Sequence, residues 1–390
     1  MSFVCRPREE SGLDLRSAPH NRLQPYHPRS RSTIESAQAL VVHPGAQGLL
    51  YKHFPEDFTR VSTASRPVIA EMVPFSVEPQ FVDRVWGLMD LRPWYDHVAD
   101  QEPVGEVWLT GDDCKVATGP HAGKSLGALF QENPLSLLGQ DAVDSGSPLL
   151  IKLIFAREKL SVQVHPDDRL AQKYGGPRGK TECWYTLAAE PHAKVALGLK
   201  PDVTLETVKS GIENGTLEES LNLLPVRAGD LIFVDAGTVH AIWPGSVLLE
   251  TQQYSDTTYR MYDYGRGREL HVDKSIEATR LVTNAGIIPP AVLPDRTVLI
   301  ESAYFSVEKI PVDVSRSSTT LRRSSDSVPT LSYLFAASGS ARIASPSFAP
   351  LDLPERGIIA VPACSPVFAV QDLGGLDLIR ISAQTPGKGR

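Results

Sequence analysis

The sequence predicts a mainly β protein with a few short helices. Apolar and polar residues alternate with period two at residues 160–165 and again at residues 180–185, which is typical of half-buried strands. The 390-residue chain also holds 29 glycines and 31 prolines, many of them between short apolar stretches, where they favour turns. Helical spacing is confined to short segments. Many short strands joined by turns indicate a β-barrel or sandwich architecture.

The first 71 residues differ from the rest of the chain. Arginines are scattered there among Ser, Pro and His, with weak apolar periodicity. Such a segment buries little surface, so we expect residues 1–71 to be a disordered extension. We further hypothesise that Met72 is the natural start. The remainder divides at the Pro289-Pro290 pair into a larger domain, residues 72–288, and a smaller one, residues 289–390.

Residues 161–165 form the most informative predicted strand. By strand alternation Ser161, Gln163 and His165 share one face, while Val162 and Val164 occupy the other. Burying a hydroxyl, an amide and an imidazole together is costly unless they have partners. The strand therefore predicts a site.

Two later segments supply such partners. Lys180, Glu182 and Trp184 share a face of the strand at residues 180–185. An apolar strand at residues 231–234 is followed by a turn, and His240 comes shortly after it.

Together, four side chains from three strand-like segments offer two imidazoles, one carboxylate and one amide. These are Gln163, His165, Glu182 and His240. This mix of nitrogen and oxygen donors suits a borderline divalent cation, and we expect one Zn²⁺ per chain.

Two short helices are predicted in the larger domain. One opens after Pro166, around Asp167 and Asp168. The other begins at a capping box, Thr216 to Glu219, which is followed by leucines at helical spacing up to residue 224.

The smaller domain is predicted to be a second barrel. Short apolar runs recur at residues 297–300, 305–310, 331–336 and 357–361, with Ser, Pro and Gly between them. Residues 289–390 contain no histidine, so we expect no metal there and a structural role.

Composition excludes several function classes. The formal net charge of −7 argues against general nucleic-acid binding, and no apolar run is long enough to span a bilayer. The four cysteines are widely spaced without a C-x-x-C pair, which favours free thiols and a cytoplasmic protein. No heptad pattern stands out, so the oligomeric state stays open.

Four motifs follow one another along the chain: SVQVHPDD at residues 161–168, GKTECWY at 179–185, GTVHA at 237–241 and ETQQYSDTTYRMYDY at 250–264. In wording and order they resemble the core of the type I mannose-6-phosphate isomerase family in its short bacterial form. Looser matches are RVWG at 84–87, GEVW at 105–108 and RELH at 268–271. One departure is Leu88, where the family commonly has a second glycine.

This resemblance implies two cupin-like β-barrel (jelly-roll) domains, with the metal-dependent catalytic domain at residues 72–288. It implies interconversion of mannose 6-phosphate and fructose 6-phosphate through an enediol(ate). Gln163, His165, Glu182 and His240 fall on metal-ligand positions, Gln163 being the weakest match.

Catalytic and substrate-binding residues follow from the same resemblance and from chemistry. Arg260 matches a catalytic position, and a buried guanidinium stabilises developing negative charge. Glu250 is the candidate base, with Lys180 as its competitor. For the phosphate of the sugar phosphate, Ser161, Lys180 and Arg266 are candidates, although Arg266 fits a solvated loop arginine slightly better.

Two alternatives stay open. A related cupin isomerase would act on another sugar or sugar phosphate, because specificity depends on the pocket rather than on the fold. A non-catalytic sugar-phosphate-binding protein would lack a ligand or the catalytic arginine, yet all of these residues are present.

Overall fold

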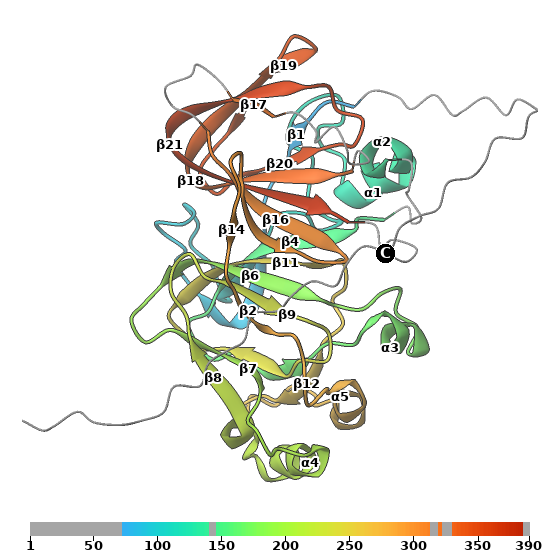
Figure 1. Ribbon diagram of the computed structural model, residues 1–390, viewed down its shortest axis with the longest axis vertical. Coiled ribbons are helices and arrows are strands. Elements are labelled where there is room, and N and C mark those ends of the chain that lie inside the picture. The colour runs from blue at the N-terminus through green and yellow to red at the C-terminus, as the bar shows by residue number, and fades with distance from the viewer. Residues whose placement is uncertain (1–71, 140–145, 313–318, 322–329, 385–390) are drawn as a thin grey trace, which may run out of the picture. The chain divides into compact units, whose positions relative to one another are not determined.

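The computed structural model describes residues 72–139, 146–312, 319–321 and 330–384. The predicted disordered extension, residues 1–71, lies outside these described residues, and the hypothesis that Met72 is the natural start therefore stays a prediction. Within them the predicted mainly β fold with short helices is confirmed (Figure 1).

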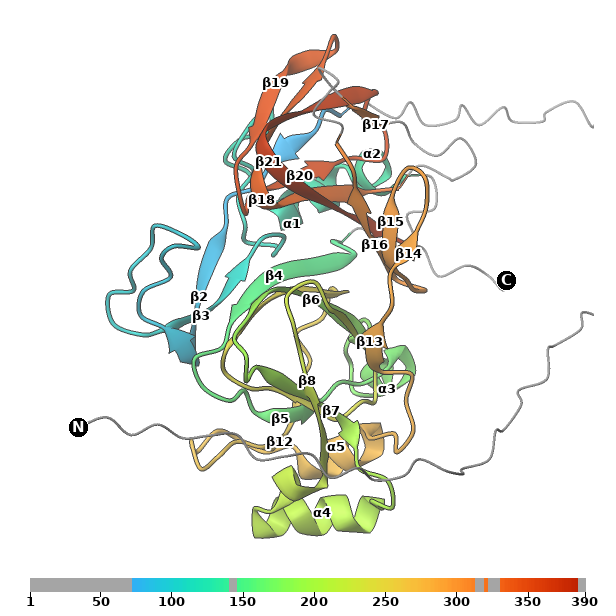
Figure 2. The ribbon, with the colours of Figure 1, turned by 60° about the vertical axis from the view of Figure 1, so that its left-hand side comes forward.

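Two sheets facing each other form the first barrel (Figure 2). The seven-stranded sheet has the order β13 (Gly286–Ile288), β9 (Leu231–Val234), β6 (Glu182–Ala189), β11 (Ser246–Gln253), β4 (Leu149–Phe155), β3 (Val104–Trp108) and β2 (Gln80–Leu88). The five-stranded sheet has the order β12 (Tyr259–Tyr262), β5 (Val162–Val164), β10 (His240–Ile242), β7 (Lys194–Leu199) and β8 (Leu221–Pro225).

A nine-stranded sheet forms the second barrel. Its main order is β1 (Phe75–Ser76), β20 (Ile358–Val361), β18 (Ser332–Ser345), β21 (Phe368–Ala383), β16 (Phe305–Ile310), β15 (Thr297–Glu301) and β14 (Ala291–Val292). The four apolar runs predicted as strands between residues 297 and 361 correspond to four of its strands, β15, β16, β18 and β20. β17 (Thr319–Leu321) pairs with β21, and β19 (Phe348–Leu353) pairs with β18. β1 therefore joins, at the beginning of the described chain, the sheet of the C-terminal half.

The helices are short and lie on the outside of the sheets. They are α1 (Leu126–Glu132), α2 (Pro134–Leu138), α3 (Asp168–Lys173), α4 (Leu205–Asn214), α5 (Val272–Ala278) and the 3-10 turn η1 (Leu217–Ser220). The predicted helix after Pro166 is confirmed as α3, whose N-cap is Asp167. Val208 and Ile212 of α4 pack with Val162 and Val164, so α4 covers the outer face of the five-stranded sheet.

The helix predicted from Thr216 is only a single 3-10 turn. Thr216 makes no side-chain cap, and the chain leaves the turn at Leu221 to become β8. Leu221 pairs with Leu199 of β7, so strand pairing buries the leucine that appeared to continue a helix. A stretch of leucines that spans only two helical turns is too short to distinguish a helix from a turn followed by a strand.

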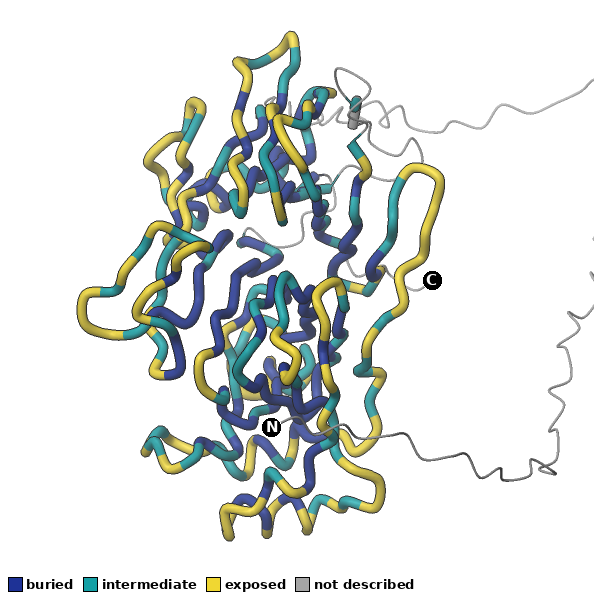
Figure 3. The backbone as a smooth tube through the Cα atoms, turned by 90° about the vertical axis from the view of Figure 1, so that its left-hand side faces the viewer, coloured by how far each residue is buried: buried dark blue, intermediate teal, exposed yellow. Residues whose placement is uncertain are grey.

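Buried backbone gathers inside and between the barrels (Figure 3). β4, which lies next to the central strand β11 of the seven-stranded sheet, is buried along its whole length, so the sheet is covered there on both faces. Ile151, Leu153 and Phe155 pack in a core that also contains Phe305 and Tyr333 of the second barrel. The residues between them in sequence face the interior of the first barrel. This sheet is thus the wall shared by the two barrels.

Candidate functional site

One row of the site lies across the five-stranded sheet. His240 of β10 and Arg260 of β12 both pair directly with Gln163 of β5, the strand between them. Directly opposed residues of antiparallel strands project to the same face of a sheet. Because Val162 and Val164 face the helices, Gln163 faces the barrel interior, together with His240 and Arg260.

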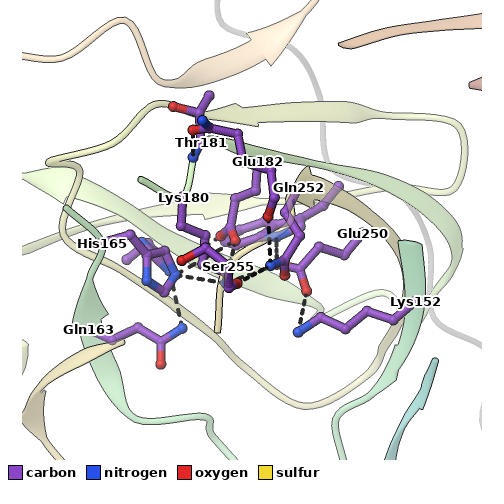
Figure 4. Close-up of polar contacts among 12 residues, drawn as sticks. Lys152, Gln163, His165, Lys180, Thr181, Glu182, Glu250, Gln252 and Ser255 are labelled. Atoms are coloured by element: carbon purple, nitrogen blue, oxygen red, sulfur yellow. Dashed lines mark hydrogen bonds and ion pairs between the residues drawn. The ribbon is translucent and has the colours of Figure 1, made fainter. Parts of the chain in front are cut away.

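The second row lies across the facing seven-stranded sheet. Glu250 of β11 is paired with Lys152 on one side and with Trp184 on the other. Glu182 lies two residues from Trp184 on the same face, as the sequence predicted. Figure 4 shows Glu182, Glu250 and Lys152 facing Gln163 and His165, with Lys180 beside His165 and Glu182.

His165, Glu182 and His240 form a buried group whose ligand atoms lie within 4.8 Å of one another. The Nδ1 atoms of His165 and His240 each lie 2.9 Å from a backbone carbonyl oxygen, that of Thr257 and Thr238 respectively. These contacts assign the proton to Nδ1 and leave the Nε2 lone pairs directed inward. His165 Nε2 is 3.6 Å from Glu182 Oε2, and His240 Nε2 is 3.4 Å from Glu182 Oε1.

These three residues fit a divalent metal on chemical grounds. Burial lowers the pKa of His240 to about 4, and burial together with the Lys180 ammonium lowers the pKa of His165 well below its ordinary value. Both imidazoles are therefore neutral at physiological pH, as metal ligation requires. Two inward lone pairs beside one carboxylate are donors that Zn²⁺ prefers.

Gln163 approaches the group through its amide nitrogen. Gln163 Nε2 lies 3.2 Å from His240 Nε2, and its Oε1 accepts from the Ser161 hydroxyl at 3.3 Å. A ligand role requires the amide oxygen to face inward, which a half-turn of the amide achieves with the heavy atoms in the same places.

Alternating carboxyl and ammonium groups continue from Glu182 across the seven-stranded sheet to Lys180, Glu250 and Lys152. Lys180 Nζ is 2.7 Å from Glu182 Oε2, 3.0 Å from His165 Nε2 and 3.6 Å from Glu250 Oε1. Lys152 Nζ contacts the other oxygen of Glu250 at 2.9 Å. All of these side chains are at most 4% exposed, so each charge depends on its neighbours for stabilisation.

The two glutamates respond in opposite directions to these surroundings. Burial and the neighbouring Glu250 raise the pKa of Glu182 well above its ordinary value. Burial also acts to raise the pKa of Glu250, but the ammonium groups of Lys152 and Lys180 outweigh it and hold that pKa well below the ordinary range. Without a metal, Glu250 is therefore the carboxylate that carries the negative charge of the pair, whereas Glu182 would have to give up its proton to bind a metal ion.

The remaining predicted residues are placed differently. Ser161 is buried beside Gln163, and Arg260 is partly exposed, with its Nη1 bonded to the Glu269 carbonyl at 2.9 Å. Arg266 is occupied by its own surroundings: its Nη2 lies 2.9 Å from the Lys159 carbonyl and 3.1 Å from Asp263 Oδ1. Arg266 is therefore bonded within its own surroundings rather than left to solvent, which differs from the expected solvated loop arginine.

Sequence reasoning missed Lys152 and Glu106. Lys152 also contacts Glu106 Oε1 at 3.3 Å, and Arg84 Nη2 pairs with Glu106 Oε2 at 2.8 Å. A signal was present, because Lys152 is the one charged residue in the strand LLIKLIF. A lysine in such a run is rarely buried without a partner, but its partners come from distant strands.

The depressed histidine pKa values predict an acid-sensitive metal-free protein. An imidazole in the unfolded chain takes up a proton near pH 6.5, whereas His240 in the fold does so near pH 4. Stability from neutral His240 is therefore complete above pH 6.5 and declines as the pH falls toward 4. Between pH 7 and pH 4, chelated wild type should lose ~3 kcal/mol more unfolding free energy than His240→Gln in urea titrations. Equal losses in the two proteins would contradict this prediction.

Comparison with known proteins places this geometry in context. The family described as phosphomannose isomerase type I, catalytic domain, matches residues 75–199. The chain is 38% identical over 251 residues to mannose-6-phosphate isomerase ManA of Bacillus subtilis, covering 60% of this chain and 78% of that protein. It is 36% identical over 249 residues to mannose-6-phosphate isomerase of Streptococcus mutans, covering 60% of this chain and 78% of that protein.

Solved structures agree with the sequence matches. The crystal structure of mannose 6-phosphate isomerase from Bacillus subtilis matches with a TM-score of 0.70 at 28% identity, covering 80% of this chain and 100% of that one. A mannose 6-phosphate isomerase bound with zinc and yttrium shares the fold, with a TM-score of 0.63 at 16% identity over 80% of this chain and 100% of its own. In the described part of this chain, no helix is long and apolar enough to cross a membrane.

Proposed function

The chain belongs to the type I phosphomannose isomerase family, and on this premise we propose that it interconverts mannose 6-phosphate and fructose 6-phosphate through an enediolate. The observation that carries the proposal is the convergence of two imidazole lone pairs and the Glu182 carboxylate beside an ionised, buried Glu250. This arrangement combines a metal site with a base, which are the two requirements of aldose–ketose isomerisation.

The metal would be held by His165, Glu182 and His240, with Gln163 as a fourth ligand after its amide turns. When bound, Zn²⁺ supplies a Lewis acid that stabilises negative charge on the sugar oxygens. The zinc-bound structural relative supports this choice of ion. One ion per chain is part of the proposal.

Glu250 is proposed to move the proton between the two carbons. Its carboxylate removes the proton from C2 of the aldose, and the electron pair of that bond forms a C1–C2 double bond while the carbonyl pair moves onto the C1 oxygen. The proton of the C2 hydroxyl passes to the C1 oxygen, and Glu250 returns its proton to C1, so that C2 becomes the carbonyl carbon of the ketose. Lys152 holds Oε2 of Glu250 and so fixes the orientation of the carboxylate, leaving Oε1 on the side of Lys180. A positioned general base typically contributes about 10²- to 10⁴-fold to the rate.

Two cations are proposed to act on the oxygens and the phosphate. The Lys180 ammonium lies between Glu182 and Glu250, so it can donate to the sugar oxygens as their charge develops. Arg260 projects into the same interior from the opposite sheet and supplies a permanent positive charge. Ser161 and Lys180 are the proposed phosphate-binding residues, with Arg266 as the weakest candidate.

Two further assignments belong to this proposal. Residues 72–288 are taken as the catalytic domain and residues 289–390 as the smaller barrel, with β1 added to the latter by strand pairing. The wide spacing of the four cysteines supports a cytoplasmic location.

A coupled assay with mannose 6-phosphate tests the function directly. We expect turnover to fructose 6-phosphate by metal-replete protein, near-complete loss after chelation, and recovery when Zn²⁺ is added back. Other aldose and ketose phosphates, assayed in parallel, would identify a different preferred substrate. Turnover that survives verified metal removal would contradict the mechanism.

A further inference from the structure

The backbone around Lys180 is held by three successive hydrogen bonds. The peptide N–H groups of residues 179–181 donate in turn to Asp168 Oδ1 at 2.7 Å, the Pro166 carbonyl at 3.0 Å and Gln253 Oε1 at 2.9 Å. The Lys180 side chain therefore projects toward the site from a segment in which every N–H is bonded.

Asp168 is the centre of this clamp. Gln253 Nε2 donates to the same Oδ1 of Asp168 at 2.9 Å, which joins the two side chains of the clamp to each other. The backbone of Gly179 packs closely against that of Asp167, because a Cβ at position 179 would lie 2.5 Å from the carbonyl carbon of Asp167. A shift of Asp168 is thus transmitted to the peptide bonds that flank Lys180.

The other oxygen of Asp168 is bonded to the second barrel. The Tyr304 hydroxyl donates to Asp168 Oδ2 at 3.0 Å, from the turn that joins β15 and β16. The Tyr304 backbone is itself held, since its N–H donates to Ser302 Oγ at 3.3 Å and its carbonyl accepts from Gln384 at 2.8 Å. Burial, followed by the Asp168 carboxylate, raises the pKa of Tyr304 to about 12, so the phenol keeps its proton at neutral pH.

We propose that Asp168 is a positioning residue for Lys180 and that Tyr304 makes the second barrel part of the active site. This inference rests on the proposed function and adds to it a role for the C-terminal half, which the sequence suggested to be only structural. It follows from the continuous path from Tyr304 through Asp168 to the peptide bonds of Lys180.

The path should affect rate more than stability. Lys180 Nζ makes close contacts with His165 and Glu182, and a displacement of about 1 Å in a catalytic group can lower a rate about a hundredfold. A groove of about 520 Å³ between the barrels is lined by Thr181, Phe233 and Tyr304, among other residues. When the Tyr304 hydroxyl is removed, water from this groove can donate to Asp168 Oδ2 in its place. The contact that links Asp168 to the second barrel is then lost, but the Asp168 carboxylate is not left without a hydrogen-bond donor.

Tyr304→Phe tests the proposal against a matched control, Tyr95→Phe. Tyr95 also donates across the barrels, to the Arg356 carbonyl at 3.0 Å, but without contact to the clamp. In the metal-replete full chain we expect Tyr304→Phe to lower kcat for mannose 6-phosphate about five- to tenfold and to speed amide hydrogen exchange at residues 179–181. Tyr95→Phe should do neither, at a comparable change in Tm. If the two variants match in both kcat and exchange, the proposal is overturned.

A double-mutant cycle with Asp168→Ala tests the path itself. We expect Asp168→Ala to lower kcat more than Tyr304→Phe does, and we expect Tyr304→Phe to have no further effect in the Asp168→Ala background. An undiminished effect of Tyr304→Phe in that background would show that the hydroxyl acts elsewhere and would overturn the path.

The two proposals fail in different ways. If wild type does not turn over mannose 6-phosphate, the proposed function fails, whereas exchange at residues 179–181 still reports whether Tyr304 supports the clamp. If wild type turns over the substrate but exchange is unchanged by Tyr304→Phe, the clamp fails alone.

Discussion

Replacing Glu250 with glutamine is expected to lower kcat about a thousandfold while leaving the bound metal in place. The physical reason is that the amide is nearly isosteric with the carboxylate but cannot accept the proton from C2. Glu250 is 2% exposed, and Lys152 and Lys180 keep it ionised. Because the position is buried, bulk water cannot replace the carboxylate as the base. KM should change much less than kcat, because the groups proposed to bind the substrate are untouched.

Glu308→Gln is the matched control for this substitution. Glu308 is also a largely buried carboxylate, but it lies in the second barrel and pairs with Arg296 and Arg380. Its replacement removes a comparable buried charge without touching the site. Elemental analysis and steady-state kinetics on both variants separate a loss of base from a loss of fold. Near-normal turnover by Glu250→Gln would remove Glu250 from the role of base.

Replacing His240 with alanine is expected to abolish metal binding and to lower kcat/KM at least about a thousandfold. His240 is fully buried, and its Nε2 is directed at Glu182, so alanine removes one of three converging ligands and leaves no nearby substitute. The loss of a Lewis acid that contributes several kcal/mol corresponds to a rate effect of about this size. The measurement is zinc content by elemental analysis together with the coupled assay.

His192→Ala serves as the control, because His192 lies at the surface, where its Nε2 is 3.2 Å from Glu190 Oε2. This variant should keep both metal and activity. Full zinc content and unchanged kcat/KM in His240→Ala would contradict the assignment of the site.

Period-two alternation was the part of the sequence that predicted the site most directly. It placed Gln163 and His165 on one face and Glu182 with Trp184 on another, and the structure has both arrangements. The reason is local: successive side chains of a strand point to opposite faces whatever the strand pairs with. The same reasoning predicted the strands of the second barrel, because turns and apolar runs are also local signals.

Local patterns failed where two structures share the same spacing. Leu217, Leu221 and Leu224 have helical spacing, but Leu221 begins a strand because β7 offers it backbone partners. Tertiary pairing overrides a weak helical preference when it satisfies the backbone and buries the same side chains.

By itself, the sequence determined the β class, the faces of the strands and the set of polar residues from which a metal site could be built. Only the tertiary structure decided which of these residues meet. The separation of 75 positions between His165 and His240 specifies no distance in space, and the pairing of β5 with β10 brings the two histidines together. Lys152 and the Tyr304–Asp168 contact were likewise invisible, because their partners come from distant strands or from the other barrel. Buried charges are tolerated only beside such partners, and which groups become neighbours is a property of the fold rather than of any local pattern.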